Sequence, residues 1–311
     1  MSLSKLSPTL STKDLFLKAC DQGNLGLVRE LLALGADVNW RGELENWQLH
    51  KGVSGLLLAT RGGHEDLLDL LLSQPGVEVN IKSDYSQTPL MVACLIGKEN
   101  IVRRLLQVPG IQLNCQDNCT WSALHLAVVC GRSGCVQQLR GAPGLDWNIK
   151  ECSGLTPLLM AADLGKAECL QVFLIVPQPY LDLTSTDRNG YNVAWLAVKG
   201  SVRSGDRLRC VELLSRDPRV DWNTRDQAGD TPLLFCLKKN RIGLAKILLD
   251  NPRVSLDVRA LTGNTRRTSP GKSFSIFPLC FSLLTLTMQG AESPRDPGSH
   301  VDWRSHQGEV V

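Results

Sequence analysis

A small residue recurs at a nearly constant interval through most of this 311-residue chain. Three successive steps are 34 residues long, and the next two are 36 and 39 residues long. The recurring residues are Ala59, Ala93, Ala127, Ala161, Ala197 and Cys236. A period of this length indicates a structural unit that is repeated in tandem and buries its apolar face against its neighbours. We therefore expect an elongated array rather than one compact core.

Each repeated unit carries the signals of two helices. Residues that can cap a helix stand five positions before the small residues, at Ser54, Thr88, Ser122, Thr156, Asn192 and Thr231. Proline follows three of them, and the first helical position tolerates proline because its N–H needs no partner. Glycine, which ends a helix cheaply at positive φ, follows at Gly63, Gly97, Gly131 and Gly165. An apolar pair such as Leu71-Leu72 lies twelve residues after the small residue, so each unit is predicted to be helix, tight turn, helix.

A polar turn follows each second helix. A β-prone stretch such as Val79-Asn80 leads to an acidic residue with glycine three positions later, as in Asp187 and Gly190. The T-P-L openings, the G-K or G-H between helices, and D-V-N before D-x-x-G together resemble the ankyrin repeat. The resemblance covers about residues 13–263. It implies an all-α repeat solenoid of about seven helix-turn-helix units joined by β-hairpin loops.

The periodicity divides the chain into three parts. Residues 1–12 are expected to form a disordered N-terminus, 13–263 the array, and 264–311 an irregular C-terminal tail or a degenerate eighth repeat. Insertions at about 41–53 and within 199–208 break the register and predict surface loops. The predicted units are 13–40, 51–83, 84–116, 117–150, 151–186, 187–225 and 226–263, of which the first resembles an N-terminal cap that lacks its hairpin.

Some positions depart from the family pattern. The histidine that follows T-P-L is kept only as His125, and the same position holds Met91, Leu159, Trp195 and Leu234 in other units. Arg140 stands where the second residue of an apolar pair is expected. Each departure is expected to loosen its own repeat without changing the fold.

The chain lacks the residue patterns of common catalytic and metal sites. His64 and Glu65 have no second histidine one helical turn later, so the helical zinc-protease pattern is absent. Four cysteines cluster in one unit without C-x-x-C spacing, at Cys115, Cys119, Cys130 and Cys135. The stretch 269–273 lacks the first glycine of a phosphate-binding loop. We therefore expect neither an enzyme nor a bound cofactor or metal.

Charge and cysteine content bear on the class of ligand and on the cellular compartment. Lysine and arginine number 34 against 31 acidic residues, and this formal net charge of +3 is too small to predict nucleic-acid binding. Eleven cysteines without paired spacing and an N-terminus without an apolar signal run favour a reducing compartment. We expect a monomeric protein of the cytoplasm, with the nucleus as the alternative.

The resemblance implies that the function is protein binding by the concave groove. The groove residues it predicts are Arg61, Gln87, Leu95, Ile96, Trp121, Val129, Leu155, Tyr191, Lys199, Asp230, Lys238 and Lys239. The apolar residues lie centrally and the lysines at one end, which suits a partner with apolar anchors and an acidic end. Trp121 is the strongest candidate, and the alternative is that the apolar residues pack only against neighbouring repeats. The main hypothesis is a non-catalytic adaptor or scaffold.

The loop asparagines, including Asn39, Asn80 and Asn114, are expected to tie adjacent backbones together. Hydroxylation of this asparagine in some ankyrin proteins implies modification as an alternative, and Ser269 follows a basophilic kinase pattern. The apolar run 274–288 is 15 residues long, short of the roughly 20 that a membrane helix needs. Membrane anchoring by this run and a ubiquitin-ligase substrate receptor remain the alternative functions, although no cullin-recruiting box is recognisable in 264–311.

Overall fold

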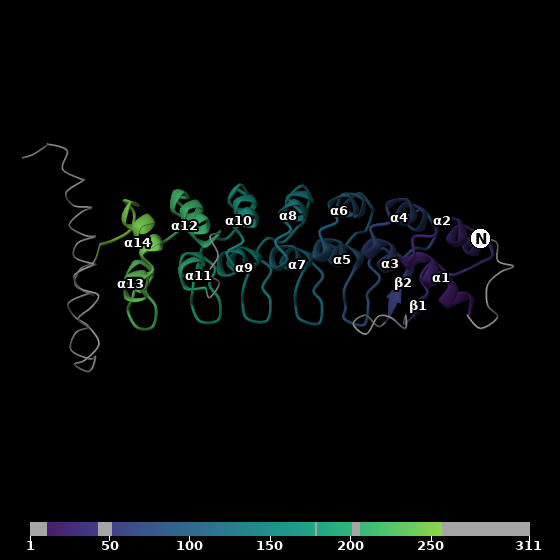
Figure 1. Cartoon of the computed structure of the whole chain (residues 1–311), viewed down its shortest axis with the longest axis horizontal. Coiled ribbons are helices and arrows are strands. Elements are labelled where there is room, and N and C mark those ends of the chain that lie inside the picture. Colours follow the sequence, from purple (N-terminus) through teal and green to yellow (C-terminus); the bar gives the residue numbers. More distant parts are fainter. Residues whose placement is uncertain (1–10, 43–51, 178, 201–205, 257–311) are drawn as a thin grey trace, which may run out of the picture.

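The computed structural model describes residues 11–42, 52–177, 179–200 and 206–256, and the helices in these ranges follow one another in pairs (Figure 1). The pairs are α1 (Thr12–Asp21) and α2 (Leu25–Ala33), α3 (Gly55–Gly62) and α4 (Glu65–Leu72), α5 (Pro89–Ile96) and α6 (Glu99–Leu106), α7 (Ala123–Val129) and α8 (Ser133–Leu139), α9 (Pro157–Asp163) and α10 (Ala167–Leu174), α11 (Val193–Lys199) and α12 (Asp206–Arg216), α13 (Pro232–Lys238) and α14 (Ile242–Leu249).

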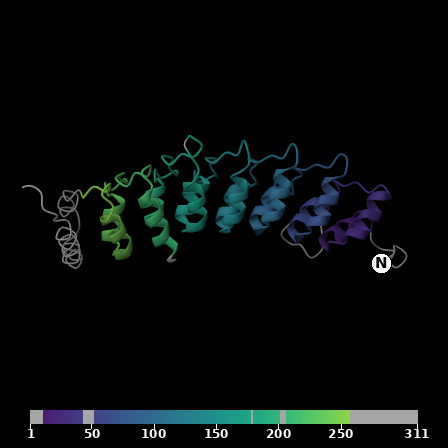
Figure 2. The ribbon, with the colours of Figure 1, turned by 90° about the horizontal axis from the view of Figure 1, so that it is seen from above.

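The helices form two rows. Each odd-numbered helix packs against the next odd-numbered helix, and α6, α8, α10, α12 and α14 pack in series behind them. Figures 1 and 2 show one elongated array, with long loops projecting from the odd-numbered row. This arrangement confirms the predicted all-α repeat solenoid. The predicted tail 264–311 and most of the predicted N-terminus lie outside the described residues, and the boundaries of the repeats stay predictions.

The helices begin and end where the capping signals predict. All six predicted N-cap side chains accept a hydrogen bond from the backbone N–H three residues later, from Ser54 (3.3 Å to Leu57 N) to Thr231 (3.4 Å to Leu234 N). The four inter-helix glycines have φ between 66° and 82°. One boundary differs, because Ser11 accepts from Asp14 N at 3.1 Å and α1 therefore begins at Thr12.

The loops before the odd-numbered helices are tight turns that have little strand structure. In the described residues, the only named strands are β1 (Arg41–Gly42) and β2 (Val53–Ser54), an antiparallel pair that closes the base of the first insertion. Later loops are closed by one backbone bond between residues four apart, such as Asp117 N to Trp121 O at 3.0 Å. In four of these turns the first residue is acidic and its side chain accepts two backbone N–H bonds in place of a strand ladder, at Asp117, Glu151, Asp187 and Asp226.

The loop asparagines bridge consecutive units. Asn114 donates from Nδ2 to Gly144 O at 2.9 Å and accepts from Asp146 N at 2.9 Å. Asn39, Asn80, Asn148 and Asn223 make the same two bonds to the following unit. In the unit between those of Asn148 and Asn223, Thr184 stands at the position of the loop asparagine. At this junction the side chain of Arg219 donates to Leu174 O and Val176 O of the preceding unit.

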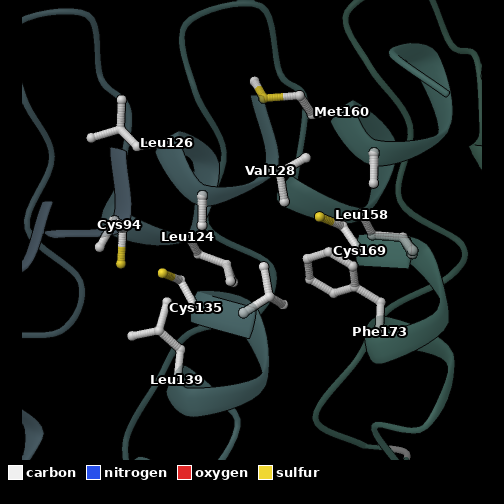
Figure 3. Packing of buried hydrophobic residues seen from close by; sticks show 14 of the residues in the cluster. Cys94, Leu124, Leu126, Val128, Cys135, Leu139, Leu158, Met160, Cys169 and Phe173 are labelled. Atoms are coloured by element: carbon white, nitrogen blue, oxygen red, sulfur yellow. The ribbon is translucent and has the colours of Figure 1, made fainter. Parts of the chain in front are cut away.

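The core runs without interruption along the array. Figure 3 shows buried side chains from neighbouring units pointing toward one another, with the sulfurs of Cys94 and Cys135 facing each other. The first residue of most apolar pairs is fully buried, as in Leu71, Leu105 and Leu139, whereas in the pair Leu213–Leu214 the second residue is the buried one. Arg140 is exposed at the C-cap of α8, so its charge reaches solvent at the edge of the core.

Candidate functional site

The predicted groove residues occupy two recurring places on the odd-numbered row. One set lies in the last turn of these helices or at the cap, where Arg61, Leu95 and Val129 hold the same position in α3, α5 and α7. The other set lies just before an N-cap, as Gln87 and Trp121 do. We call the surface formed by these two sets the inner face.

Four predicted residues come together around a hollow of about 200 Å³ between α3 and α5. Arg61 lies on the α3 side, Leu95 and Ile96 lie on the α5 side, and Gln87 precedes the α5 N-cap. All four contribute to the lining although up to 35 residues separate them in the chain. We call this hollow the α3–α5 pocket.

Buried side chains form the floor of the α3–α5 pocket. Val53, Leu57 and Leu58 are 4%, 3% and 1% exposed, so they hold the floor in place from the core. Leu57 and Leu58 were not among the predicted groove residues, whereas Val53 holds the position before an N-cap from which groove residues were predicted. Leu57 and Leu58 fall inside the expected first helix of their unit, where the repeat pattern gives no signal for a position that lines the groove.

Trp121, Val129 and Leu155 lie apart from the α3–α5 pocket. Each is half-buried on the inner face and packs against the core. The backbone of Trp121 is held by Asp117, whose Oδ1 accepts from Trp121 N at 2.9 Å. Part of each side chain therefore packs against the array, as the alternative interpretation predicts. The other part faces outward.

The prediction of an accessible Asp230 is wrong. Asp230 is only 8% exposed, and its carboxylate accepts from Lys238 Nζ at 2.5 and 2.7 Å. The residue folds back because the turn before α13 places it beside the last turn of that helix. The pairing also neutralises part of the predicted basic end. Lys199 lies 3.6 Å over the ring of Tyr191, and Lys239 is exposed.

Partial burial shifts the pKa of two charged groups on the inner face. Partial burial lowers the pKa of Arg61, and the nearby carboxylate of Asp21 acts in the opposite direction. Burial raises the pKa of Asp163, which holds the Arg61 position in α9, and the nearby Arg207 opposes that rise. Arg61 in α3 and Asp163 in α9 therefore present opposite charges on the inner face in partly desolvated surroundings.

Arg207 joins two odd-numbered helices and was not among the predicted residues. Its side chain is 5% exposed and donates to Leu196 O, Ala197 O and Asp163 O at 3.2, 2.8 and 2.7 Å. It therefore satisfies carbonyl groups at the ends of two odd-numbered helices, α9 and α11. The insertion within 199–208 interrupts the repeat spacing around Arg207, so the sequence pattern does not indicate the role of this residue.

The described residues contain no group of three or more histidine, cysteine or acidic side chains arranged to hold a metal ion. The four clustered cysteines are spread over a loop, a helix end and a helix, with Cys119 exposed and Cys135 buried. Cys135 instead meets Cys94, and this thiol–thiol hydrogen bond together with burial raises the pKa of Cys94. Within the same ranges, no helix has the length and apolar character needed to cross a membrane, and the run 274–288 lies outside them.

Asn39, Asn80 and Asn114 hold their amides in the bridges described above, and their hydroxylation stays a prediction. Ser269 lies outside the described residues.

Comparisons with known proteins agree with this geometry. Residues 56–151 match the family model for ankyrin repeats in three copies. The crystal structure of EF0377, an ankyrin repeat protein, is 22% identical, has a TM-score of 0.57, and covers 63% of this chain and 96% of its own. The ankyrin repeat domain of Bcl-3, a unique member of the IkappaB protein family, is 24% identical, has a TM-score of 0.62, and covers 75% of this chain and 96% of its own.

A comparison with curated protein sequences gives no significant match. The structural likenesses therefore establish the fold. Ankyrin repeats generally mediate protein–protein interactions and are typically non-catalytic.

Proposed function

This chain folds as an ankyrin-repeat array, and from that premise we propose that it is a non-catalytic adaptor or scaffold that binds a partner protein through its inner face. The observation that carries the proposal is the α3–α5 pocket, where four predicted groove residues meet over an apolar floor. Solvent-facing apolar surface that is held by a rigid core is what protein partners most often cover.

The inner face also suggests how a partner is oriented. Apolar side chains follow one another along the inner face, from Leu95 in α5 to Val129 in α7 and Leu155 in the turn before α9. Cations lie further along, where Lys199 at the end of α11 and Lys239 at the C-cap of α13 are exposed. A partner segment with apolar anchors and an acidic end fits this order, because buried apolar groups supply affinity and charges set direction and association rate.

The free thiols favour a reducing compartment for this activity. Ten cysteines of the described residues are free, and six of them are buried. We therefore place the protein in the cytoplasm or nucleus. Immunofluorescence of the tagged full-length chain tests this placement, and secretion into the medium would contradict it.

Affinity capture with variants tests the proposed function. The full chain and its Trp121→Ala variant serve as baits, and the affinity for each captured partner is then measured with purified proteins. We expect Trp121→Ala to weaken binding by about 2 kcal/mol or more, since a half-buried tryptophan supplies large contact area. Gln137→Ala, at an exposed position of α8 in the other row, is the control and should bind like the wild type.

Circular dichroism separates binding from folding in this test. Helicity and melting temperature of Trp121→Ala should stay close to the wild-type values. Equal losses of stability and affinity would place Trp121 in the core. A partner that Trp121→Ala and Gln137→Ala bind equally well would contradict a role for the centre of the inner face.

A further inference from the structure

We propose that the α3–α5 pocket receives one apolar side chain of an extended peptide segment whose neighbouring carboxylate lies beside Arg61. This inference rests on the proposed function and names the chemistry of the partner at one subsite. The ligand class is a short linear segment of a protein, with an aliphatic or aromatic anchor and an acidic residue close to it in sequence.

The size of the α3–α5 pocket selects a single side chain. Its volume is about 200 Å³. An apolar cavity of about 150 Å³ holds one benzene molecule, whereas pockets for drug-sized ligands span roughly 300–1,000 Å³. The pocket is therefore large enough for a leucine, methionine or phenylalanine side chain and too small for a nucleotide or a comparable metabolite.

The lining of the pocket matches an apolar anchor. Val92, Leu95 and Ile96 are half-buried along α5 and face a floor of buried aliphatic side chains. An apolar group seated there would remove the exposed parts of these three side chains from water. Hydrophobic burial of this kind needs no rearrangement of the core, because α3 and α5 already pack against each other.

One polar atom in the lining of the α3–α5 pocket has no hydrogen-bond partner among the described residues. Gln87 Oε1 is shielded from solvent and makes no hydrogen bond in the described structure, although its backbone is fixed to Ser83 by bonds of 3.0 and 3.2 Å. An amide oxygen accepts hydrogen bonds, so a donor is what completes this site. The backbone N–H of a peptide supplies such a donor beside its side chain, and a free hydrocarbon ligand does not.

Arg61 supplies the charge preference. It is exposed at the end of α3, borders the apolar lining, and has Asp21 as a neighbouring acid. A guanidinium has five N–H donors, so it can bind a carboxylate from a partner while it keeps other contacts. The next three odd-numbered helices carry Leu95, Val129 and Asp163 at this position. Among these four helices, a cation therefore stands at this position only in α3, beside the α3–α5 pocket.

Peptide selection on the full-length chain tests the inference. A random octapeptide library displayed on phage is selected against residues 1–311, and the enriched peptides are synthesised and measured by fluorescence anisotropy. We expect an enriched motif of one large apolar residue with Asp or Glu one to three positions away. Replacing that acid by its amide should weaken binding several-fold, in line with loss of a charge-assisted bond.

Variants of the chain locate the bound peptide. Leu95→Lys should weaken binding by about tenfold or more, because it places a charge on the wall of the pocket. Arg61→Gln should remove the preference for the acid over its amide while it keeps the preference for the apolar anchor. Gln137→Lys, which places the same charge at an exposed position of α8 in the other row, is the control and should bind within about twofold of the wild type.

The outcomes separate this inference from the proposed function. Selected peptides that tolerate Leu95→Lys and Arg61→Gln but fail on Lys199→Glu would overturn the pocket and leave binding by the inner face in place. A selection that yields no apolar–acidic motif would also overturn it, and capture with Trp121→Ala would then decide the proposed function alone. If Leu95→Lys does not fold by circular dichroism, Arg61→Gln at its exposed position still decides the acid preference.

Discussion

The imidazole of His125 lies 3.1 Å from the carbonyl oxygen of Leu155, so this side chain joins the first helix of one unit to the turn of the next. Its other ring nitrogen lies 3.2 Å from Ser122 N at its own N-cap. These two bonds fit a neutral ring with the proton on Nε2. Trp195, at the same position two units later, donates from Nε1 to Thr224 O at 3.1 Å and makes the same connection without a histidine.

His125 is expected to make the stability of the array depend on pH. Burial is the main cause that lowers the pKa of His125 below the usual value of 6.5. The unfolded chain therefore binds a proton more readily than the folded chain, and the free energy of unfolding should fall as pH drops below about 6.5. Urea unfolding between pH 7.5 and 5.5 measures this slope.

His125→Leu is the comparison for that slope, because Leu159 and Leu234 occupy the same position in other units. The variant should lose about 1–3 kcal/mol at pH 7.5, since Leu155 O loses its partner, and it should show a shallower dependence on pH. An identical slope in both proteins would assign the titration to another group.

Asn114→Ala should lower the free energy of unfolding by about 1–3 kcal/mol, because it removes both bonds that tie its turn to the backbone of the next unit. Asn189→Ala is the matched control. The amide of Asn189 bonds within its own turn, to Asp187 Oδ2 at 3.1 Å, and its loss should cost about 0.5 kcal/mol or less. Equal costs in urea unfolding would show that the bridge between units adds nothing.

Arg207→Met should destabilise the second half of the array by at least about 2 kcal/mol, because three carbonyl oxygens at helix ends lose a buried donor. Hydrogen exchange resolves the effect along the chain and should show faster exchange in α11 and α12. The control is Arg209→Met in the same helix, where the guanidinium is exposed and should contribute about 0.5 kcal/mol or less. Unchanged protection in α11 would contradict the capping role of Arg207.

Thr120→Gly should stabilise the protein by about 1 kcal/mol. Thr120 has φ of 63° where the equivalent turns have Gly154 and Gly190 at 81° and 79°, and a β-branched residue is strained in this region. Relief of the strain is offset in part by the greater chain entropy that glycine loses on folding. Thermal and urea unfolding measure the gain. Thr184→Gly, where φ is not in the left-handed region, should lower stability, and a loss at both positions would refute strain at Thr120.

Much of the fold was predictable because its signals are local. A cap such as Thr88 and a glycine such as Gly97 act within one or two helical turns, so their spacing along the chain defines both helices of a unit. The hairpin loops carry little strand structure in the described residues, because at Asp117, Glu151, Asp187 and Asp226 an acidic side chain accepts backbone N–H groups that a strand ladder would pair. The first boundary moved by one residue because Ser11 is a better cap than the residue after it.

The positions of the groove residues also followed from the period, since Arg61 and Leu95 lie 34 residues apart. The period alone does not indicate which positions are accessible. Asp230 is buried because Lys238 folds onto it, and the α3–α5 pocket is open because the side chains of two neighbouring units leave space between them. The sequence by itself determined the repeating unit, its helix ends and the register of its faces, through interactions within a few residues. Only the tertiary structure decided burial, the role of Arg207 and the place of the pocket, because these depend on contacts between side chains from different units.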